Sequence, residues 1–427
     1  MKNELSWRAL LSALDYPLLA AVAAVYSIGV VTIYSAGGGS AGMGSFYAGR
    51  QLIWGAVSLA VLGILLRIDT ELFLEHSYVL YGLCCLTLVL LFVLGHRAKG
   101  AQSWIDLGVL RVQPAEFAKI GVAFVMARRL TQFPPVNLKN FAQALVLGGV
   151  SALLVLVQPD LGSTLVYATM IFAALMVAGT PKRYLLSLTG AGVALLPVGW
   201  MLLKEYQKKR ILVFINPELD PLGAGYNVIQ SRIAVGSGHF WGKGFMQGAQ
   251  SKLRFLPEPH TDFIFSVFAE EFGLVGGLIL LALLTFILLR MMRVAIRSRS
   301  VATKILVASL SASLWFHTFE SIGMSMGLLP VTGLPLPFMS YGGSSLLANI
   351  LAVGIVLRLG AAEELERREN SVPEQRAPIV VQKGCYSFAV KMLIARPRPN
   401  AGATVGAHRF IPFWRRPTRI SMKDDRF

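Results

Sequence analysis

One short segment of the chain concentrates residues that can move a proton. It reads Arg254-Phe-Leu-Pro-Glu-Pro-His-Thr-Asp262 and runs directly into a long apolar stretch, so Glu258, His260 and Asp262 lie within five residues at the predicted start of a helix. A carboxylate at the boundary between water and membrane can accept a proton from a substrate hydroxyl. We therefore expect Asp262 to act as a general base, with Glu258 and His260 beside it. Capping of the helix N-terminus is an equally open explanation for Asp262.

A second group of polar residues enters another apolar stretch. Pro114 suits the first turn of a helix, which places Glu116 and Lys119 three residues apart on one face. Ionisable residues inside a membrane are costly unless they are paired or line a wet cavity. A salt bridge that only supports packing is the structural explanation, whereas Arg111 and Gln113 in the same few residues favour a binding site.

Other segments interrupt the apolar pattern. Gln158-Pro-Asp160 predicts a turn in which Asp160 either caps the next helix or serves a site. Three prolines and four glycines in residues 327–345 indicate a re-entrant segment, tolerated only where protein or water covers its backbone. The glycine-rich stretch 236–244 lacks Walker A spacing and predicts close approach of the backbone to a large ligand. No spacing of His and Cys is typical of a metal site.

The composition places these residues on a membrane scaffold. Of 427 residues, 55% are hydrophobic and 15% are charged, whereas soluble domains carry about 25% charged residues. Stretches of about 20 mostly apolar residues predict spanning helices. We expect an all-α polytopic membrane protein with about ten transmembrane helices, at residues 17–36, 51–67, 77–95, 114–130, 141–158, 161–179, 184–203, 263–289, 304–328 and 342–360.

Basic residues set the expected orientation. With the N-terminus in the cytoplasm, the predicted inner segments hold thirteen Lys and Arg residues and the short outer loops hold four, as the positive-inside rule requires. Both termini are then cytoplasmic, and residues 204–262 form a large extracytoplasmic loop between helices 7 and 8. That loop is itself basic, as an anionic substrate would require, and Lys243 and Lys252 are candidates to bind it.

A change of composition marks the end of the membrane domain. We expect a ten-helix domain over residues 1–362 and a basic, Pro-containing cytoplasmic tail over 363–427 that is disordered. Residues 371–427 hold eleven Lys or Arg against three Asp or Glu, which is 8 of the formal net charge of +17. No nucleic-acid-binding motif accompanies this charge, so contact with anionic lipid is the simpler explanation. Three cysteines exclude a disulfide framework.

Several ordered motifs resemble the RodA/FtsW family of polytopic glycosyltransferases, also called SEDS proteins. The resemblance covers roughly residues 10–360, and Gly248-Ala-Gln-Ser-Lys252 is similar to the elongation branch rather than the division branch. Ser321 departs from the family, which usually has Asn there, and the tail beyond about residue 370 has no counterpart. The motifs are Lys99-Gly-Ala-Gln-Ser-Trp104, Val112-Gln-Pro-Ala-Glu-Phe-Ala-Lys119, Gln158-Pro-Asp-Leu-Gly162, Asp220-Pro-Leu-Gly-Ala-Gly-Tyr226, Phe255-Leu-Pro-Glu-Pro-His-Thr-Asp-Phe263 and Leu334-Pro-Leu-Pro-Phe-Met-Ser-Tyr-Gly-Gly343.

The resemblance implies a peptidoglycan glycosyltransferase that polymerises lipid II during cell-wall elongation and rod-shape maintenance. Asp262 corresponds to the catalytic aspartate proposed for the family, and we expect Arg111 and Lys119 to bind the diphosphate of a lipid substrate. The remaining residues expected to bind substrate are Trp104, Gln113, Glu116, Asp160, Lys243, Lys252, Glu258, His260, Ser340 and Tyr341.

The resemblance also implies a location and partners. It predicts the bacterial cytoplasmic (inner) membrane, an active site on the outer face, and contact with the nascent glycan strand, a class B penicillin-binding protein and other elongation-complex membrane proteins. The sequence does not show a cofactor, although a divalent cation (Mg²⁺ or Mn²⁺) would be compatible with the chemistry. Two alternatives stay open, namely a lipid II flippase and a non-catalytic scaffold for the penicillin-binding protein.

Overall fold

Long helices make up most of the chain. The structure is a computed structural model that describes residues 7–98, 101–106, 111–221, 223–252 and 255–371. The helices and strands are α1 (Trp7–Ser12), α2 (Tyr16–Ala36), η1 (Gly39–Ala41), α3 (Gly44–Leu65), α4 (Thr70–Glu75), α5 (Ser77–Leu94), β1 (His96–Ala98), β2 (Ala101–Asp106), β3 (Arg111–Val112), α6 (Pro114–Gln132), α7 (Leu138–Val157), α8 (Leu161–Val177), α9 (Lys182–Ala194), α10 (Leu196–Leu202), α11 (Glu205–Ile215), η2 (Pro217–Leu219), α12 (Ala224–Ser237), α13 (Ala249–Lys252), α14 (Ile264–Arg297), α15 (Val301–Ser325) and α16 (Gly343–Ser371).

Within the described residues, seven helical segments are long and apolar enough to cross a bilayer. They are α2, α3, α7, α9 together with α10, α14, α15 and α16. Helices α5 and α8 are apolar but shorter, and α6 carries the charged residues of the second polar group. Each predicted range overlaps one of these helices, so the polytopic helical class is confirmed. The number of bilayer crossings stays a prediction.

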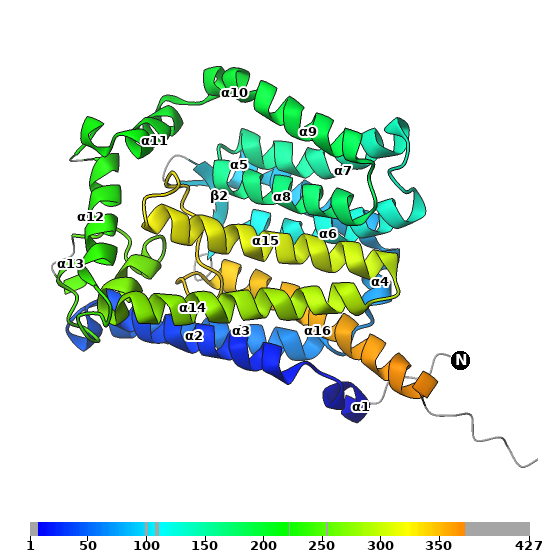
Figure 1. Ribbon diagram of the computed structural model, residues 1–427, viewed down its shortest axis with the longest axis horizontal. Coiled ribbons are helices and arrows are strands. Elements are labelled where there is room, and N and C mark those ends of the chain that lie inside the picture. Colours follow the sequence, from blue (N-terminus) through cyan, green and yellow to red (C-terminus); the bar gives the residue numbers. More distant parts are fainter. Residues whose placement is uncertain (1–6, 99–100, 107–110, 222, 253–254, 372–427) are drawn as a thin grey trace, which may run out of the picture. The chain divides into compact units, whose positions relative to one another are not determined.

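Helix α15 lies in the middle of the helical bundle, packed against α6, α8 and α14 (Figure 1). Of its apolar window, 72% is buried, whereas none of the window in α9 and α10 is buried. Buried small residues, Ser309, Ser311 and Ser313, let neighbouring backbones come close to α15. Helices α9, α10 and α11 instead run as an arch along the edge of the bundle (Figure 1), and lipid is the natural cover for the exposed apolar side chains of α9 and α10.

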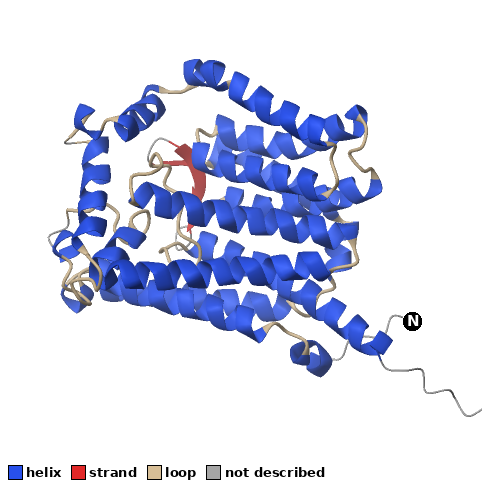
Figure 2. Ribbon diagram, in the orientation of Figure 1, coloured by secondary structure: helices blue, strands red, loops and turns tan. Residues whose placement is uncertain are grey.

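Three short strands add a feature that the sequence did not predict (Figure 2, red). Strand β2 pairs antiparallel with β1 and β3, with Ile105 opposite Val112 and Asp106 opposite Arg111. Strands this short show no clear alternation of apolar and polar residues, so their sequences cannot be distinguished from that of a polar loop. The sheet matters for the site because β3 leads directly into Gln113 and α6.

Helix α14 is broken at Gly273, and another segment of the chain fills the break. Gly273 has φ 65° and ψ −164°, a conformation open essentially to glycine alone. In an unbroken helix, the N–H groups of residues 274 and 275 would donate to the carbonyls of residues 270 and 271. Here all four groups bond to residues 239–244. The bonds are Leu274 N to His239 O (2.9 Å), Val275 N to Phe240 O (3.1 Å), Lys243 N to Glu270 O (3.0 Å) and Gly244 N to Glu271 O (3.0 Å).

The glycine-rich stretch 236–244 therefore approaches the backbone of α14, and its approach to a large ligand stays a prediction. A Cβ added at Gly238 would collide with the carbonyl of Ala269, and one added at Gly242 would collide with the carbonyl of Glu271. The sequence correctly indicated a close approach, but a pattern of glycines does not show which partner comes close.

Replacing Gly273 by Ala should lower the unfolding temperature of the protein. Strain at this backbone conformation costs about 1–3 kcal/mol, and the added Cβ would collide with the backbone nitrogen of Gly242. Thermal unfolding of the purified protein in detergent measures the change. Gly63→Ala is a matched control because its Cβ would meet nothing within 4 Å. Equal unfolding temperatures for the two variants would contradict the prediction.

The end of the predicted membrane domain falls inside a helix. Helix α16 continues to Ser371, so the first residues of the predicted tail belong to it. Residues 372–427 lie outside the described part of the chain, and the predicted disorder of the tail lies there with them. The long segment 204–262 contains the helices α11, α12 and α13.

Candidate active site

Asp262 lies in the turn directly before α14 and does not cap that helix. The N-cap residue is Phe263, which makes no side-chain capping hydrogen bond. Asp160, by contrast, is the N-cap of α8, where its Oδ1 accepts a hydrogen bond from the N–H of Ser163 at 3.0 Å. Of the two explanations left open for Asp262, the structure therefore removes helix capping.

Asp262 lines a cavity of about 310 Å³. Glu258, Arg210 and Asn227 line the same cavity and give it polar walls. The backbone of Glu258 has a φ of 50°, a strained conformation of the kind that clusters at functional sites. A mixture of apolar surface and a few convergent polar groups suits a sugar ring. The remaining lining residues are Val213, Val228, Pro257, Phe263 and Val331.

The turn that carries Asp262 is held by the re-entrant segment between α15 and α16. The hydroxyl of Ser340 donates to the carbonyl of Thr261 at 2.8 Å and accepts from the N–H of Leu336 at 2.8 Å. The N–H of Tyr341 donates to the carbonyl of His260 at 2.9 Å. Ser340 and Tyr341, predicted to bind substrate, thus act on the backbone beside Asp262.

His260 belongs to an aromatic cluster next to this turn. Its ring stacks on Tyr47 with centroids 4.2 Å apart and an interplanar angle of 16°. Tyr341 lies 5.6 Å from His260 and 5.2 Å from Tyr47 by ring centroids. The cluster connects the turn to α3 and fixes the orientation of the imidazole.

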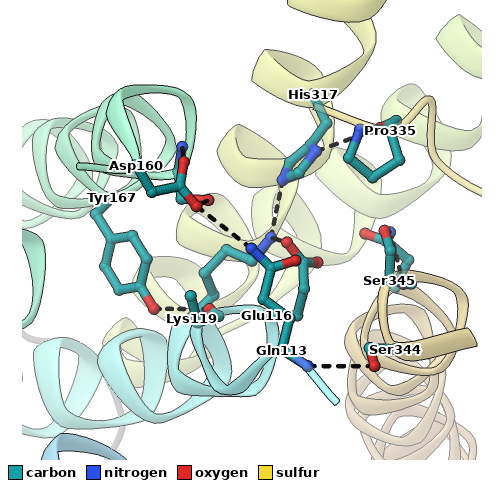
Figure 3. A network of polar contacts seen from close by, with 12 residues as sticks. Gln113, Glu116, Lys119, Asp160, Tyr167, His317, Pro335, Ser344 and Ser345 are labelled. Carbon is teal, nitrogen blue, oxygen red and sulfur yellow. Dashed lines mark hydrogen bonds and ion pairs between the residues drawn. The ribbon is translucent and has the colours of Figure 1, made fainter. Parts of the chain in front are cut away.

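The second predicted group forms a buried network (Figure 3). Glu116 and Lys119 are only 2% and 4% exposed, and their charged atoms lie 2.8 Å apart. The ammonium of Lys119 also lies 2.8 Å from Nε2 of His317, whose Nδ1 is 3.4 Å from the carbonyl of Pro335. Because the ammonium has only donors, Nε2 accepts and Nδ1 carries the proton, which makes the imidazole neutral. The Oε2 atom of Glu116 is buried and has no hydrogen-bond partner within the described structure.

Gln113 connects this network to the turn between α7 and α8. Its Nε2 donates to Oδ2 of Asp160 at 3.3 Å, and its backbone N–H donates to Ser344 at 3.3 Å. Burial raises the pKa of Asp160, although hydrogen bonds from Ser163 oppose that shift. Gln113 and Asp160 thus lie beside Glu116 and Lys119 (Figure 3), and the substrate roles expected for these four residues stay predictions.

The re-entrant segment separates the cavity from the buried network and touches both. On the cavity side, the carbonyl of Val331 accepts from Nη1 of Arg210 at 3.4 Å. On the network side, the carbonyl of Pro335 faces His317. Between these points, a Cβ added at Gly162 would lie 3.0 Å from Thr332 and Leu334, so α8 packs closely on the same segment. The prolines and glycines of this segment thus form a shared wall.

Two basic residues predicted to bind substrate already have acidic partners. Arg111 lies in β3 with a side chain 74% exposed, and its Nε is 3.2 Å from Oδ2 of Asp106. Lys243 lies 2.8 Å from the fully buried Glu270. Each of the two cations therefore has a charge partner within the protein itself. The roles of Arg111 and Lys243 in substrate binding stay predictions.

Two polar residues of the cavity, Arg210 and Asn227, were not among the predicted site residues. From the sequence, Arg210 was only one of several basic residues in the long loop. The available signal was its spacing on α11, because Arg210 and Val213 lie three residues apart and therefore share a face of the helix. Two further predicted residues lie elsewhere. Trp104 is in β2, and Lys252 ends α13, with a side chain outside the described structure.

Among the described residues, no group of three or more His, Cys, Asp or Glu side chains is arranged to hold a metal ion. Glu258 and Asp262 nevertheless share the cavity. Mg²⁺ commonly binds through one or two carboxylates together with substrate phosphates. The donor set therefore fits a cation that arrives with a diphosphate substrate, rather than one held in a protein cage.

These features define a class of protein, namely a multi-pass helical membrane protein with a carboxylate-lined cavity beside a re-entrant segment. The FTSW_RODA_SPOVE family model, described as cell cycle protein, matches residues 16–365. The chain belongs to this family.

Named relatives cover most of the chain. It is 40% identical over 348 residues to the peptidoglycan glycosyltransferase MrdB of Escherichia coli K12, covering 81% of this chain and 93% of that one. It is 31% identical to the peptidoglycan glycosyltransferase RodA of Treponema pallidum, covering 82% and 98%.

Solved structures share the fold. One match is a chain from a solved structure described as "Structural coordination of polymerization and crosslinking by a peptidoglycan synthase complex". The two chains superpose with a TM-score of 0.71 and are 32% identical, and the match covers 81% of this chain and 97% of that one. The rod shape determining protein RodA of Thermus thermophilus matches with a TM-score of 0.63 and 29% identity, covering 81% and 96%.

Proposed function

We propose that the protein is a peptidoglycan glycosyltransferase that polymerises lipid II, a disaccharide-pentapeptide on undecaprenyl diphosphate, in cell-wall elongation. Relatives named peptidoglycan glycosyltransferase support the reaction class. The likeness to a rod shape determining protein supports the role in elongation. The observation that carries the chemistry is Asp262, which lines a cavity and is not used as a helix cap.

The proposed reaction joins the growing glycan chain, as donor, to an incoming lipid II, as acceptor. The 4-hydroxyl oxygen of the acceptor GlcNAc forms a bond to the anomeric carbon of the donor MurNAc. The bond from that carbon to the diphosphate oxygen breaks, and undecaprenyl diphosphate leaves with the electron pair. Attack from the opposite face inverts the carbon and gives a β-1,4 linkage. The carboxylate of Asp262 takes the proton of the attacking hydroxyl.

A divalent cation, Mg²⁺ or Mn²⁺, is part of the proposal. Glu258 and Asp262 would hold it together with the substrate diphosphate, where it would offset negative charge. If this is so, a chelator should reduce polymerisation and added Mg²⁺ or Mn²⁺ should restore it.

Polymerisation by the purified full-length protein tests the proposed function directly. Labelled lipid II in detergent should yield glycan strands that a muramidase digests. A flippase would move lipid II across vesicle membranes without forming strands, and a scaffold would form none unless a second polymerase were added. Either of those results with folded protein would overturn the proposal.

We further propose a class B penicillin-binding protein as partner, within the membrane proteins of the elongation complex. The match to a chain of a peptidoglycan synthase complex that couples polymerization and crosslinking supports this choice. A transpeptidase bound to this protein would receive each new glycan strand as it forms.

The proposed location is the bacterial inner membrane, with both termini in the cytoplasm and the cavity on the outer face. A cysteine at Gln247, which is exposed and lies in the long segment 204–262, should react with a membrane-impermeant thiol reagent in intact cells. Cysteines at Arg299 and Asn400 should be protected until the membrane is permeabilised. The measurement uses a background without the three native cysteines. The reverse labelling pattern would contradict the proposed topology.

A further inference from the structure

Arg210 brings a positive charge to the cavity that contains Asp262. Its side chain extends from α11, with Nη1 3.4 Å from the carbonyl of Val331 and Cζ 5.8 Å from the ring centroid of Tyr206. No acidic side chain of the described residues forms an ion pair with it. Since a guanidinium has five N–H donors, most of its hydrogen-bonding capacity is available to a ligand.

Three other cations of the long loop are paired with carboxylates, and Lys204 and Arg232, which form no ion pair within the described residues, do not line the cavity. Arg210 is set apart because it brings the positive charge to the described wall of the cavity. The matched pairs are Lys208 with Glu205 (3.0 Å), Lys209 with Asp220 (2.9 Å) and Lys243 with Glu270 (2.8 Å).

The helix that carries Arg210 is anchored to the rest of the protein. The hydroxyl of Tyr206 and Nε2 of Gln207 both donate to the carbonyl of Pro159, at 3.3 and 3.4 Å. Val213 is only 2% exposed and lines the cavity with Arg210. A cation held on an anchored helix is pre-organised for binding, which strengthens its contact with a ligand.

Apart from Arg210, the charged residues among the described lining of the cavity are Glu258 and Asp262, whose carboxylates do not attract an anion. Arginine meets phosphate oxygens with two parallel hydrogen bonds, a geometry that lysine does not offer. We propose that Arg210 binds the diphosphate of the lipid-linked donor. This inference rests on the proposed function. It places the donor substrate at the part of the cavity that contains Arg210.

Both substrates carry a diphosphate, and the reaction geometry decides between them. In the donor, the diphosphate is attached to the anomeric carbon that reacts, so it lies next to the attacked carbon. In the acceptor, the diphosphate is a whole disaccharide away from the 4-hydroxyl that Asp262 deprotonates. A cation in the same cavity as Asp262 therefore meets the donor diphosphate, whose departure it would assist by offsetting the developing charge.

Kinetics with separated substrates tests the assignment. Lipid II with a blocked GlcNAc 4-hydroxyl serves only as donor, and a lipid II analogue that keeps the 4-hydroxyl but has a non-cleavable bond at the anomeric carbon serves only as acceptor. Arg210→Met should raise the KM for the donor by about 10- to 100-fold, the range for losing a charge-assisted contact, and leave the acceptor KM unchanged. Inhibition by undecaprenyl diphosphate should weaken by a similar factor, and Arg210→Lys should fall between wild type and Arg210→Met.

Lys209→Met is the matched control, since it removes an adjacent cation that is already paired with Asp220. An unchanged donor KM in Arg210→Met, or a raised acceptor KM instead, would overturn the proposal. If Arg210→Met does not fold, Arg210→Lys supplies the same comparison. If the wild-type protein forms no glycan but binds undecaprenyl diphosphate through Arg210, the anion site stands and the polymerase function fails.

Discussion

Replacing Asp262 by Asn is expected to reduce lipid II polymerisation by about 100-fold or more, the loss typical of removing a general base. Asparagine keeps the size of the side chain but cannot take the proton of the attacking hydroxyl. Because Asp262 does not cap α14, the change should leave the helix start intact. The rate of glycan formation by equal amounts of folded protein measures the effect.

A control for this variant is Glu205→Gln, which neutralises a carboxylate whose side chain is 91% exposed. It should polymerise lipid II as the wild type does. Near-normal activity in folded Asp262→Asn would show that Asp262 is not the base. Thermal unfolding of both variants separates lost chemistry from lost structure.

Replacing Lys119 by Met is expected to destabilise the protein by roughly 3–5 kcal/mol, the usual cost of leaving one member of a buried ion pair alone. Lys119 contacts both Glu116 and His317, and one oxygen of Glu116 already has no partner in the described structure. Methionine keeps the apolar stem but supplies no donor. The unfolding temperature of the purified variant measures the loss.

The double variant Glu116→Gln with Lys119→Met distinguishes a structural pair from a substrate contact. It removes both charges, so most of the lost stability should return. If the double variant folds and polymerises lipid II normally, the pair only supports packing and the predicted diphosphate contact of Lys119 is wrong. If it folds but is inactive while Glu116→Gln alone is active, the charge of Lys119 serves the substrate.

Much of the architecture could be predicted because it depends on a property that a sequence displays directly. About 20 apolar residues are needed to cross a bilayer, and ranges chosen by that criterion overlap the observed helices. The clustering of Gln113, Glu116 and Lys119 could also be predicted from the sequence, since Pro114 starts a helix and fixes their spacing.

The missing parts depend on contacts between distant residues. A sequence shows that Lys243 is basic, but not that Glu270, 27 residues later, neutralises it. The same holds for the break at Gly273, which requires residues 239–244 to reach α14. Arg210 was overlooked for the converse reason, because nothing local reveals that a cation lacks an acidic partner.

The broken helix has a consequence for how the chain is assembled. A freshly inserted α14 can complete its own ladder, because the N–H groups of residues 274 and 275 find the carbonyls of residues 270 and 271. Opening that ladder in hydrocarbon without substitutes would cost several kcal/mol per group. The bend at Gly273 is therefore stabilised only where residues 239–244 dock. We expect the acidic turn before α14 to take its final position together with that docking, after the helix itself has formed.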